Sequence, residues 1–508
     1  MMTSEKIETS EWRFSDFAVL NGREENLRKA WISDQASPSS KYKLEDFRKE
    51  QEKNRGIIFN GKTKTIDTNI FSGYLLNRFS IILMMGKLAL YNYRFGKYVF
   101  IPEDDVKSFF YKVIEEYDSA IWTMNIEKSY FTEVLRRAKS YRNFTIPKDK
   151  LVFLNGTLSI SENKFYPGEH NPQIINFYSL EYEYNTNAEC NEFKNFLNDV
   201  FNGDESVIAN VQEMFGYTFL YGEYPIQKLF LLYGVGRNGK GVLMKLLTEL
   251  HNPMNVSAVF LDDLSERFGK QEVWDKVLNI SGERSQKKPL DTAVIKTLTG
   301  NDPISVENKY EKAFTTYIYC KFIVCSNEPI ETTDGSNGYL SRLLPIEFPN
   351  VYRELHSGEQ KVEGNHYQDK NLFGRLKEEL PGILKWALEG LFRLKGKEWN
   401  LTQSDNIDNL KMKYYYMGQP VKHFFDSCVE KGTENDSIST SLIYQYFTRW
   451  ANENDISTKC FNQVKVFHEA ARHCLDDINC SSTTKLKNGN AYYFGIKIKK
   501  NWVNITLI

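Results

Sequence analysis

The chain has 508 residues, which predicts roughly three or four domains, and 41% of its residues are hydrophobic, ample for buried cores. Its net charge of −1 excludes a global attraction to nucleic acid, so any DNA binding must use local basic patches. The 7 cysteines lack CxxC spacing, and we expect no signal peptide, which together predict free thiols in a reducing cytoplasm.

Residues 1–84 are polar and weakly periodic, and they predict no particular function. Within them, Glu45–Arg55 has the charge density of a solvent-exposed helix. The longest apolar run, Phe79–Leu90, contains Lys87 and is too short to cross a bilayer, which requires about 20 apolar residues. We therefore predict a core helix at this run and no membrane partner for the chain.

Between about residues 85 and 222, short helical and strand-like segments alternate, which is typical of a mixed α+β domain. Lys150–Phe165 predicts a hairpin with Asn155 and Gly156 in a turn, because this dipeptide favours the left-handed backbone of tight turns. Apolar residues at helical spacing predict helices over Val106–Tyr117, Phe193–Val200 and Val207–Leu220.

The segment Leu229–Leu250 has the order strand, glycine-rich turn, lysine and helix that is required of a phosphate-binding loop. Leu229–Tyr233 predicts a buried parallel strand, and apolar residues recur at helical spacing after the turn. Glycines let backbone N–H groups close around phosphate oxygens, and Lys240 is placed to reach the β- and γ-phosphates. We predict that ATP is bound by Gly234, Val235, Gly236, Arg237, Asn238, Gly239, Lys240, Gly241 and Val242.

Three further apolar strands are predicted downstream, and the first two lead directly into polar residues. They lie at Val277–Ser281, Phe322–Cys325 and Leu343–Phe348, with helical segments between them. In an α/β sheet the functional site lies at the carboxyl ends of the strands, which makes Glu283 and Asn327 candidates for the chemistry. Glu283 is placed to polarise water or hold Mg²⁺ through water, and Asn327 to orient the attacking water.

Five segments of the chain match an ordered set of motifs: Walker A at Gly234–Gly241, Walker B at Leu278–Glu283, the segment before sensor 1 at Lys296–Lys309, sensor 1 at Phe322–Pro329 and the arginine-finger segment at Tyr339–Phe348. In this order the motifs resemble those of superfamily 3 helicases of the phage, plasmid and poxvirus primase-helicase type. Further likeness upstream, at Leu154–Leu158 and Gln212–Tyr217, and downstream, at Pro381–Gly390, extends the resemblance from about residue 85 to 395.

The resemblance implies an α/β fold whose AAA+-like P-loop ATPase core, at 206–400, follows a mixed α+β helicase-associated domain at 85–205. It implies a homo-hexameric ring around DNA with ATP and Mg²⁺ between subunits. Lys240 and Glu283 would come from one subunit and Arg342 from its neighbour, where an arginine stabilises the transferring phosphoryl only after docking. The segment Ile304–Phe314 would project into the channel, with Lys309 and, less directly, Lys312 on the DNA backbone.

Two positions depart from the family pattern, and both lie on the metal side of the predicted site. Gly241 stands where Ser or Thr normally supplies a Mg²⁺ hydroxyl, and Gly282 stands where many relatives have a second acid. Because Mg²⁺ readily keeps several waters, we expect water to fill these positions, with Glu283 as a water-mediated contact.

Residues 411–508 predict a winged helix, because three helices are followed by a basic hairpin that turns at 487–490. The helices are predicted at Val421–Glu430, Ser439–Glu453 and Phe461–Cys474. The third helix has an apolar face of Phe461, Val464, Phe467, Ala471 and Cys474, and a second face of Asn462, Lys465, His468 and Arg472. In this interpretation the third helix, with Lys465, enters the major groove, while Lys485 and Lys487 meet phosphates; protein packing is the alternative use of such a domain.

We therefore predict an ATP-dependent DNA helicase of a phage, plasmid or genomic island, acting in the cytoplasm of a bacterial host. The resemblance implies 3′-to-5′ movement on single-stranded DNA, unwinding of forked DNA, and recognition of origin DNA by residues 411–508. The alternatives are an origin-binding initiator whose nucleotide site mainly drives oligomerisation, a primase-helicase, and an ATPase that remodels protein. The residues before the likeness, 1–84, are too few for a primase domain.

Overall fold

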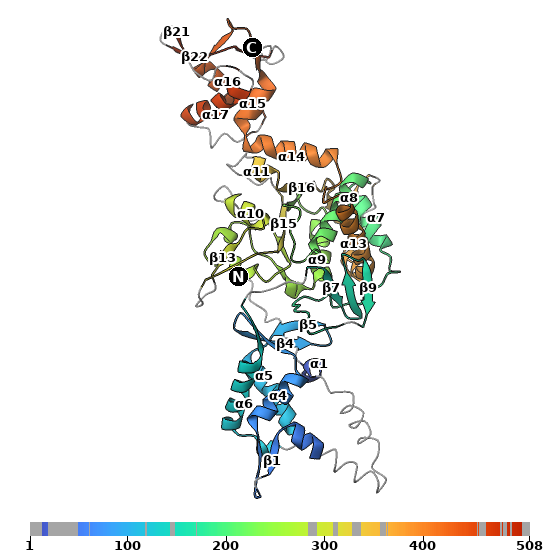
Figure 1. Cartoon of the computed structure of the whole chain (residues 1–508). Helices are drawn as coiled ribbons and strands as arrows, with labels where there is room; N and C mark the ends of the chain where they lie inside the picture. Colours follow the sequence, from blue (N-terminus) through green and yellow to red (C-terminus); the bar gives the residue numbers. More distant parts are fainter. Residues whose placement is uncertain are drawn as a thin grey trace.

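The computed structural model of the chain describes residues 13–18, 49–59, 61–116, 119–142, 148–168, 170–282, 292–307, 313–327, 337–355, 362, 364–454, 456, 464–477, 480, 485–487 and 490–499. The fold is mixed α/β, and a parallel sheet lies at its centre (Figure 1). The N-terminal elements lie at one end of this central part and the C-terminal helices at the other. In the part of the chain that is described, each helix is too short or too polar to cross a membrane.

The N-terminal part has its own hydrophobic core, built around a four-stranded sheet in the order β5-β4-β3-β6. Phe71, Phe79, Phe110 and Tyr130 are buried in this core. Its elements are α1 Phe14–Phe17, β1 Ile57–Phe59, β2 Lys64–Ile66, α4 Thr68–Arg78, β3 Ile81–Met84, β4 Lys87–Asn92, β5 Lys97–Phe100, α5 Glu103–Glu115, α6 Met124–Arg137 and β6 Lys139–Tyr141.

The apolar run 79–90 is a β-hairpin, so the prediction of a core helix was wrong. β3 and β4 pair antiparallel, and Met85 and Gly86 form the turn with φ of 53° and 78°. Two successive residues at positive φ are the geometry of the tightest hairpin turns. A continuous apolar run does not distinguish a buried strand from a buried helix, which explains the error. The predicted boundary between residues 84 and 85 falls within this turn.

The predicted hairpin at 150–165 is confirmed, and the segment adds a third strand. β7 Lys150–Phe153, β8 Gly156–Ser159 and β9 Lys164–Pro167 form an antiparallel sheet in chain order. Leu154 and Asn155 make the first turn, and Gly156 already belongs to β8. Two predicted helices follow as α7 Asn191–Val200 and α8 Glu205–Thr218.

The central sheet has five parallel strands in the order β11-β12-β15-β10-β16, which confirms the α/β class. Alternate residues of β10 enter two separate cores: Phe230 and Leu232 face the core that contains α8 and α9, while Leu229 and Leu231 face the other. This two-sided burial explains the unbroken apolar run. The strands and adjoining helices are β10 Leu229–Tyr233, α9 Lys240–His251, β11 Val256–Ser257, β12 Leu278–Ser281, α10 Thr292–Thr299, β15 Lys321–Ser326, α11 Asn337–Leu340 and β16 Leu343–Glu347.

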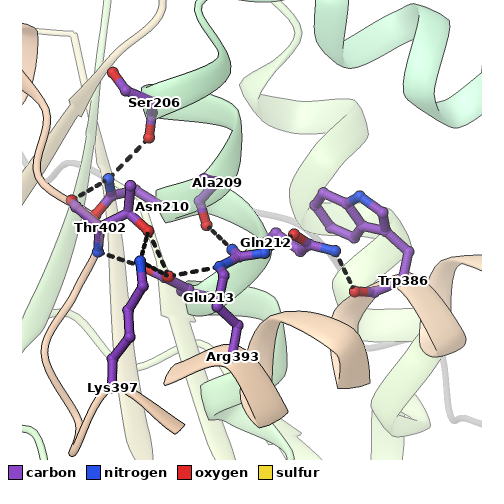
Figure 2. A network of polar contacts seen from close by, with 9 residues as sticks. All are labelled: Ser206, Ala209, Asn210, Gln212, Glu213, Trp386, Arg393, Lys397 and Thr402. Carbon is purple, nitrogen blue, oxygen red and sulfur yellow. Dashed lines mark hydrogen bonds and ion pairs between the residues drawn. The ribbon is translucent and has the colours of Figure 1, made fainter. Parts of the chain in front are cut away.

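Helix α13, Leu380–Gly396, packs closely against α8 and fixes how the chain enters the sheet. Gly216 and Gly390 lie where the two helices are closest. A Cβ on Gly216 would lie 2.3 Å from the Ala387 carbonyl oxygen, and a Cβ on Gly390 would lie 2.4 Å from the Gln212 carbonyl oxygen. Between them, the fully buried Glu213 accepts a 2.9 Å bond from Arg393 Nε (Figure 2).

The remaining elements of the central part lie at its margins. They are β13 Ile304–Val306 and β14 Phe314–Thr316, which pair antiparallel, β17 Tyr352–Arg353 and β18 His366–Tyr367, which pair parallel, and α12 Leu372–Glu378 and α14 Asp405–Gly418. The sequence did not predict α14, which contacts β16 and leads to the C-terminal part (Figure 1).

The C-terminal part has a core of its own around Phe424, Phe447, Phe467 and Tyr493. Its three helices and its basic hairpin were predicted, but part of the face of the third helix was wrong. Val464 is 49% exposed, and His468 Nδ1 lies 3.0 Å from the Tyr493 hydroxyl. The elements are α15 Pro420–Cys428, β19 Val429–Lys431, β20 Ser437–Ser439, α16 Thr440–Glu453, α17 Val464–Asp477, β21 Lys485–Lys487, β22 Asn490–Phe494 and β23 Ile496–Ile498.

The close approach of α8 and α13 predicts that Gly390→Ala lowers the free energy of unfolding. The new methyl group would overlap the Gln212 backbone, and such overpacking costs about 1–3 kcal/mol. Gly396→Ala on the same helix is the matched control, because its Cβ would meet no atom within 4 Å and alanine favours helix by up to about 1 kcal/mol. Urea unfolding checks both variants; equal stability of the two would contradict the packing.

A second stability prediction concerns His251, which is buried at the end of α9 with its ring nitrogens 2.8 Å from the Thr218 hydroxyl and 2.9 Å from that of Tyr221. Burial lowers the pKa of His251 to about 3. The neutral ring therefore stabilises the fold above the ordinary pKa of about 6.5, and this stability is lost as the pH falls from there toward 3.

We expect His251→Gln to be less stable than the wild type at pH 7.5, with a difference that shrinks by up to about 1.4 kcal/mol per pH unit below 6.5. Denaturant unfolding of both proteins from pH 7.5 to 5 measures this difference. A constant difference over that range would show that the pKa of His251 is not lower in the folded protein than in the unfolded chain.

Candidate functional site

The glycine loop, residues 234–239, joins the carboxyl end of β10 to the first turn of α9. Gly236 and Gly239 have φ of 93° and 90°, a backbone region that other residues rarely adopt. Gly236 N–H donates to the Gly234 carbonyl at 2.9 Å, and Gly234 N–H donates to the Ser326 carbonyl of β15 at 3.2 Å. The loop is thus folded on itself and tied to the neighbouring strand.

Lys240, the first residue of α9, lies beneath this loop and is only 6% exposed. Its Nζ donates to the Gly234 carbonyl and lies 3.2 Å from Asn327 Oδ1. Asn327 follows β15, which pairs with β10 in parallel, so that the two strand ends meet at one edge of the sheet. The structure therefore brings two predicted site residues into direct contact.

The Asn238 side chain is a further polar group in the loop, and its Nδ2 is buried with no hydrogen-bond partner among the residues that the structure describes. An unpaired buried donor is costly unless a bound group satisfies it. Together with the helix N-terminus, which favours negative charge, the loop and Lys240 fit a phosphate group.

The two glycines that depart from the family pattern, Gly241 and Gly282, are next to open space among the described residues. A Cβ at Gly241 or at Gly282 would meet no atom within 4 Å. Neither residue offers an oxygen ligand from a side chain, so Mg²⁺ at this position would depend on phosphate, water and the predicted Glu283. Glu283 lies outside the described residues.

Arg342 lies at the opposite edge of the sheet from the glycine loop. It directly precedes β16, and its carbonyl accepts a 2.7 Å bond from the first residue of β10, Leu229. A strand rises about 3.3 Å per residue, which places Arg342 roughly 20 Å from Gly234 along the strand direction. Arg342 therefore cannot act on phosphates held by its own glycine loop.

Lys228 lies beside Arg342 and was not singled out from the sequence. Burial, together with the positive charges of Lys411 and Arg342, lowers the pKa of Lys228 to about 8. Within the described part of the chain, neither Lys228 nor Arg342 forms an ion pair. This edge of the sheet thus concentrates positive charge, and only the tertiary pairing of β10 with β16 brings the two residues together.

The structure describes three of the five lysines that were predicted to bind DNA. Lys309 and Lys312 lie outside the described residues, between β13 and β14. Lys465 is exposed on α17, and Lys485 and Lys487 begin and end β21 at the far end of the molecule. Their roles in binding DNA stay predictions.

Comparison with known proteins places these features in context. Residues 232–342 match the model of a family of unknown function (DUF5906), and residues 96–202 match a model described as D5 N terminal like. A protein of Acanthamoeba polyphaga mimivirus named "Putative helicase L207/L206" is 24% identical over 280 residues, 52% of this chain. The chain spans 28% of the length of that viral protein.

Two solved apo structures of the NrS-1 C-terminal region are also similar. Each is 13% identical in sequence with a TM-score of 0.46; one match covers 83% of this chain and 97% of that chain, the other 85% and 100%.

The two family models and the viral relative fit a superfamily 3 helicase of the phage and poxvirus type, and they confirm the resemblance predicted from the motifs. The matched residues 232–342 run from the end of β10 through the glycine loop to Arg342. The matched segment therefore contains the glycine loop, Lys240, Asn327 and Arg342, while Lys228 lies just before it.

The open position at Gly241 generates a prediction. Gly241→Ser adds a hydroxyl in free space next to Lys240, so that we expect unchanged thermal stability and a several-fold lower Mg²⁺ concentration for half-maximal ATP hydrolysis. Gly239→Ser is the matched control: its φ of 90° and a Cβ 3.0 Å from Val200 should destabilise the loop. An unchanged Mg²⁺ requirement in Gly241→Ser would contradict the assignment of this position to the metal side.

Proposed function

We propose that the chain is an ATP-dependent DNA helicase with an AAA+-like P-loop ATPase core, acting in replication of a mobile element. The observation that carries the proposal is the contact between Lys240 Nζ and Asn327 Oδ1 at 3.2 Å, beneath a glycine loop at the carboxyl edge of a parallel sheet. In this proposal Lys240 binds the β- and γ-phosphates of ATP, Asn327 orients the attacking water, and Glu283 polarises it. Mg²⁺, when bound, neutralises phosphate charge.

The proposed ATP site is shared between two subunits of a hexameric ring. Arg342 and Lys228 stand at the sheet edge opposite the loop, unpaired by any described carboxylate, and an anion of a neighbouring subunit would satisfy them. Hydrolysis would then depend on assembly, because the arginine reaches the phosphoryl group only across a docked interface.

The DNA contacts in the proposal use two regions. The segment between β13 and β14, with Lys309 and Lys312, would line the ring channel and move along single-stranded DNA in the 3′-to-5′ direction. The C-terminal part would act as a winged helix that places Lys465 toward the major groove of origin DNA, and Lys485 and Lys487 toward phosphates. An exposed Lys465 on α17 supports this use.

A second candidate function is an origin-binding initiator whose nucleotide site mainly drives oligomerisation. Gly241 and Gly282 favour it, because neither supplies a metal ligand and hydrolysis depends on Mg²⁺. This candidate predicts DNA binding and nucleotide-dependent assembly without turnover.

The test measures ATP hydrolysis with and without single-stranded DNA, and unwinding of a forked duplex. We expect DNA-stimulated hydrolysis and unwinding by the wild type, and at least a 100-fold loss of hydrolysis in Lys240→Ala and in Arg342→Ala. Mixing the two inactive variants should restore part of the hydrolysis, because a mixed interface can pair an intact loop with an intact arginine.

The outcomes separate the candidates. Absence of hydrolysis with DNA binding retained selects the initiator, and hydrolysis that DNA does not stimulate selects a protein-remodelling ATPase. Primer synthesis by the chain would select a primase-helicase. Failure of the mixed variants to regain activity would contradict the shared site while leaving the Lys240 site intact.

A further inference from the structure

A polar pocket of about 450 Å³ lies between the end of α7 and the strands β17 and β18. It is lined mainly by Asp199 of α7, Tyr352 of β17, and His366 and Tyr367 of β18. Asp199 is the centre of its polar contacts: one carboxylate oxygen lies 3.1 Å from His366 Nδ1, and the other accepts a 2.5 Å bond from the Tyr352 hydroxyl. The two rings of Tyr352 and His366 meet edge to face at 5.2 Å.

The pocket walls are attached directly to the glycine loop. The Tyr352 N–H donates to the Arg237 carbonyl at 2.7 Å, and a Cβ at Gly239 would lie 3.0 Å from Val200, the residue after Asp199. Asp199 is therefore the sequence neighbour of a residue that lies close to the loop, and consecutive Cα atoms are only about 3.8 Å apart. The pocket is therefore within the length of one nucleotide from the phosphate position.

The charges of the pocket favour a neutral hydrogen-bond donor over a phosphate. Asp199 lies in the last turn of α7, where the helix end adds partial negative charge to the carboxylate. A carboxylate has about four lone-pair positions, and among the side chains that the structure describes Tyr352 and His366 use two of them. Burial and the contact with Asp199 raise the pKa of Tyr352, so this hydroxyl remains a donor. Positions remain on Asp199 for the hydroxyl groups of a ligand.

We infer that this pocket holds the nucleoside end of the bound nucleotide, with the ribose hydroxyls donating to Asp199 and the base lying against the rings of Tyr352 and His366. Acidic residues recognise ribose in this way in other nucleotide sites. The inference rests on the proposed function, since it assigns the phosphates to the glycine loop. It makes the site selective for ribonucleotides, because a ligand without the hydroxyls loses its hydrogen bonds to the charged Asp199 carboxylate.

Isothermal titration of the full chain with ADP, 2′,3′-dideoxy-ADP and inorganic pyrophosphate tests the inference without turnover. We expect the wild type to bind ADP at least about tenfold more tightly than the dideoxy nucleotide, because the latter lacks both hydroxyls and a single hydrogen bond to a charged group already implies about that ratio. Asp199→Asn should reduce this ratio several-fold and leave pyrophosphate binding unchanged. Asp476→Asn, the same change at an exposed position on α17, should leave all three affinities unchanged.

Two results would overturn the inference, and they are distinguishable. Equal affinity of the wild type for ADP and dideoxy-ADP, with Lys240→Ala weakening both, would remove the ribose contact and leave the phosphate site standing. Absence of binding of ADP and of pyrophosphate, or binding that Lys240→Ala does not change, would overturn the proposed function together with the pocket. The comparison of nucleotides on the wild type does not depend on whether Asp199→Asn folds.

Discussion

The buried carboxylate of Glu213 is the interaction on which the central part depends. It is paired with Arg393 and also accepts a 2.8 Å bond from the Thr402 N–H, which joins the helix before the sheet to the segment after it (Figure 2). Removing Arg393 would leave the fully buried carboxylate with the more distant Lys397, at 3.9 Å, and breaking a buried pair costs about 3–5 kcal/mol. The ion pair therefore fixes the position of α13 along α8. Gly216 and Gly390 allow the backbones of the two helices to come close enough for this pair to form.

Helix α13 also positions the glycine loop, through its contact with α7. Both oxygens of Glu379, at the start of α13, accept bonds from the first turn of α7, at 3.0 Å from Glu192 N–H and 2.8 Å from Phe193 N–H. The other end of α7 lies close to the loop, because a Cβ on Gly239 would come within 3.0 Å of Val200 and 3.3 Å of Phe196. Packing between helices that are distant in sequence thus fixes both the loop and the pocket wall at Asp199.

The parallel sheet places two groups of polar and charged side chains at opposite ends of its strands. Its carboxyl edge holds Lys240, Asn327 and the loop, while its opposite edge holds Arg342 and Lys228. Because one sheet cannot bring these edges together, the proposed site requires a second copy of the chain. The C-terminal part has a core of its own, whereas Ile82, Met84 and Tyr91 of the N-terminal sheet belong to the same core as Phe230 of β10 and the apolar residues of α9.

Local sequence determined the strand, loop and helix around Lys240, the α/β class and the basic C-terminal hairpin, because periodicity and glycine placement act over a few residues. It led to a wrong prediction of a helix at 79–90, since an apolar run without a period does not distinguish a helix from a strand, and it did not predict α14. Only the tertiary structure brought Asn327 to Lys240 across 87 residues, and Lys228 to Arg342. It also assembled the pocket of Asp199, Tyr352 and His366. Strand pairing and helix packing bring together residues that are far apart in the sequence, and local sequence patterns do not predict such contacts.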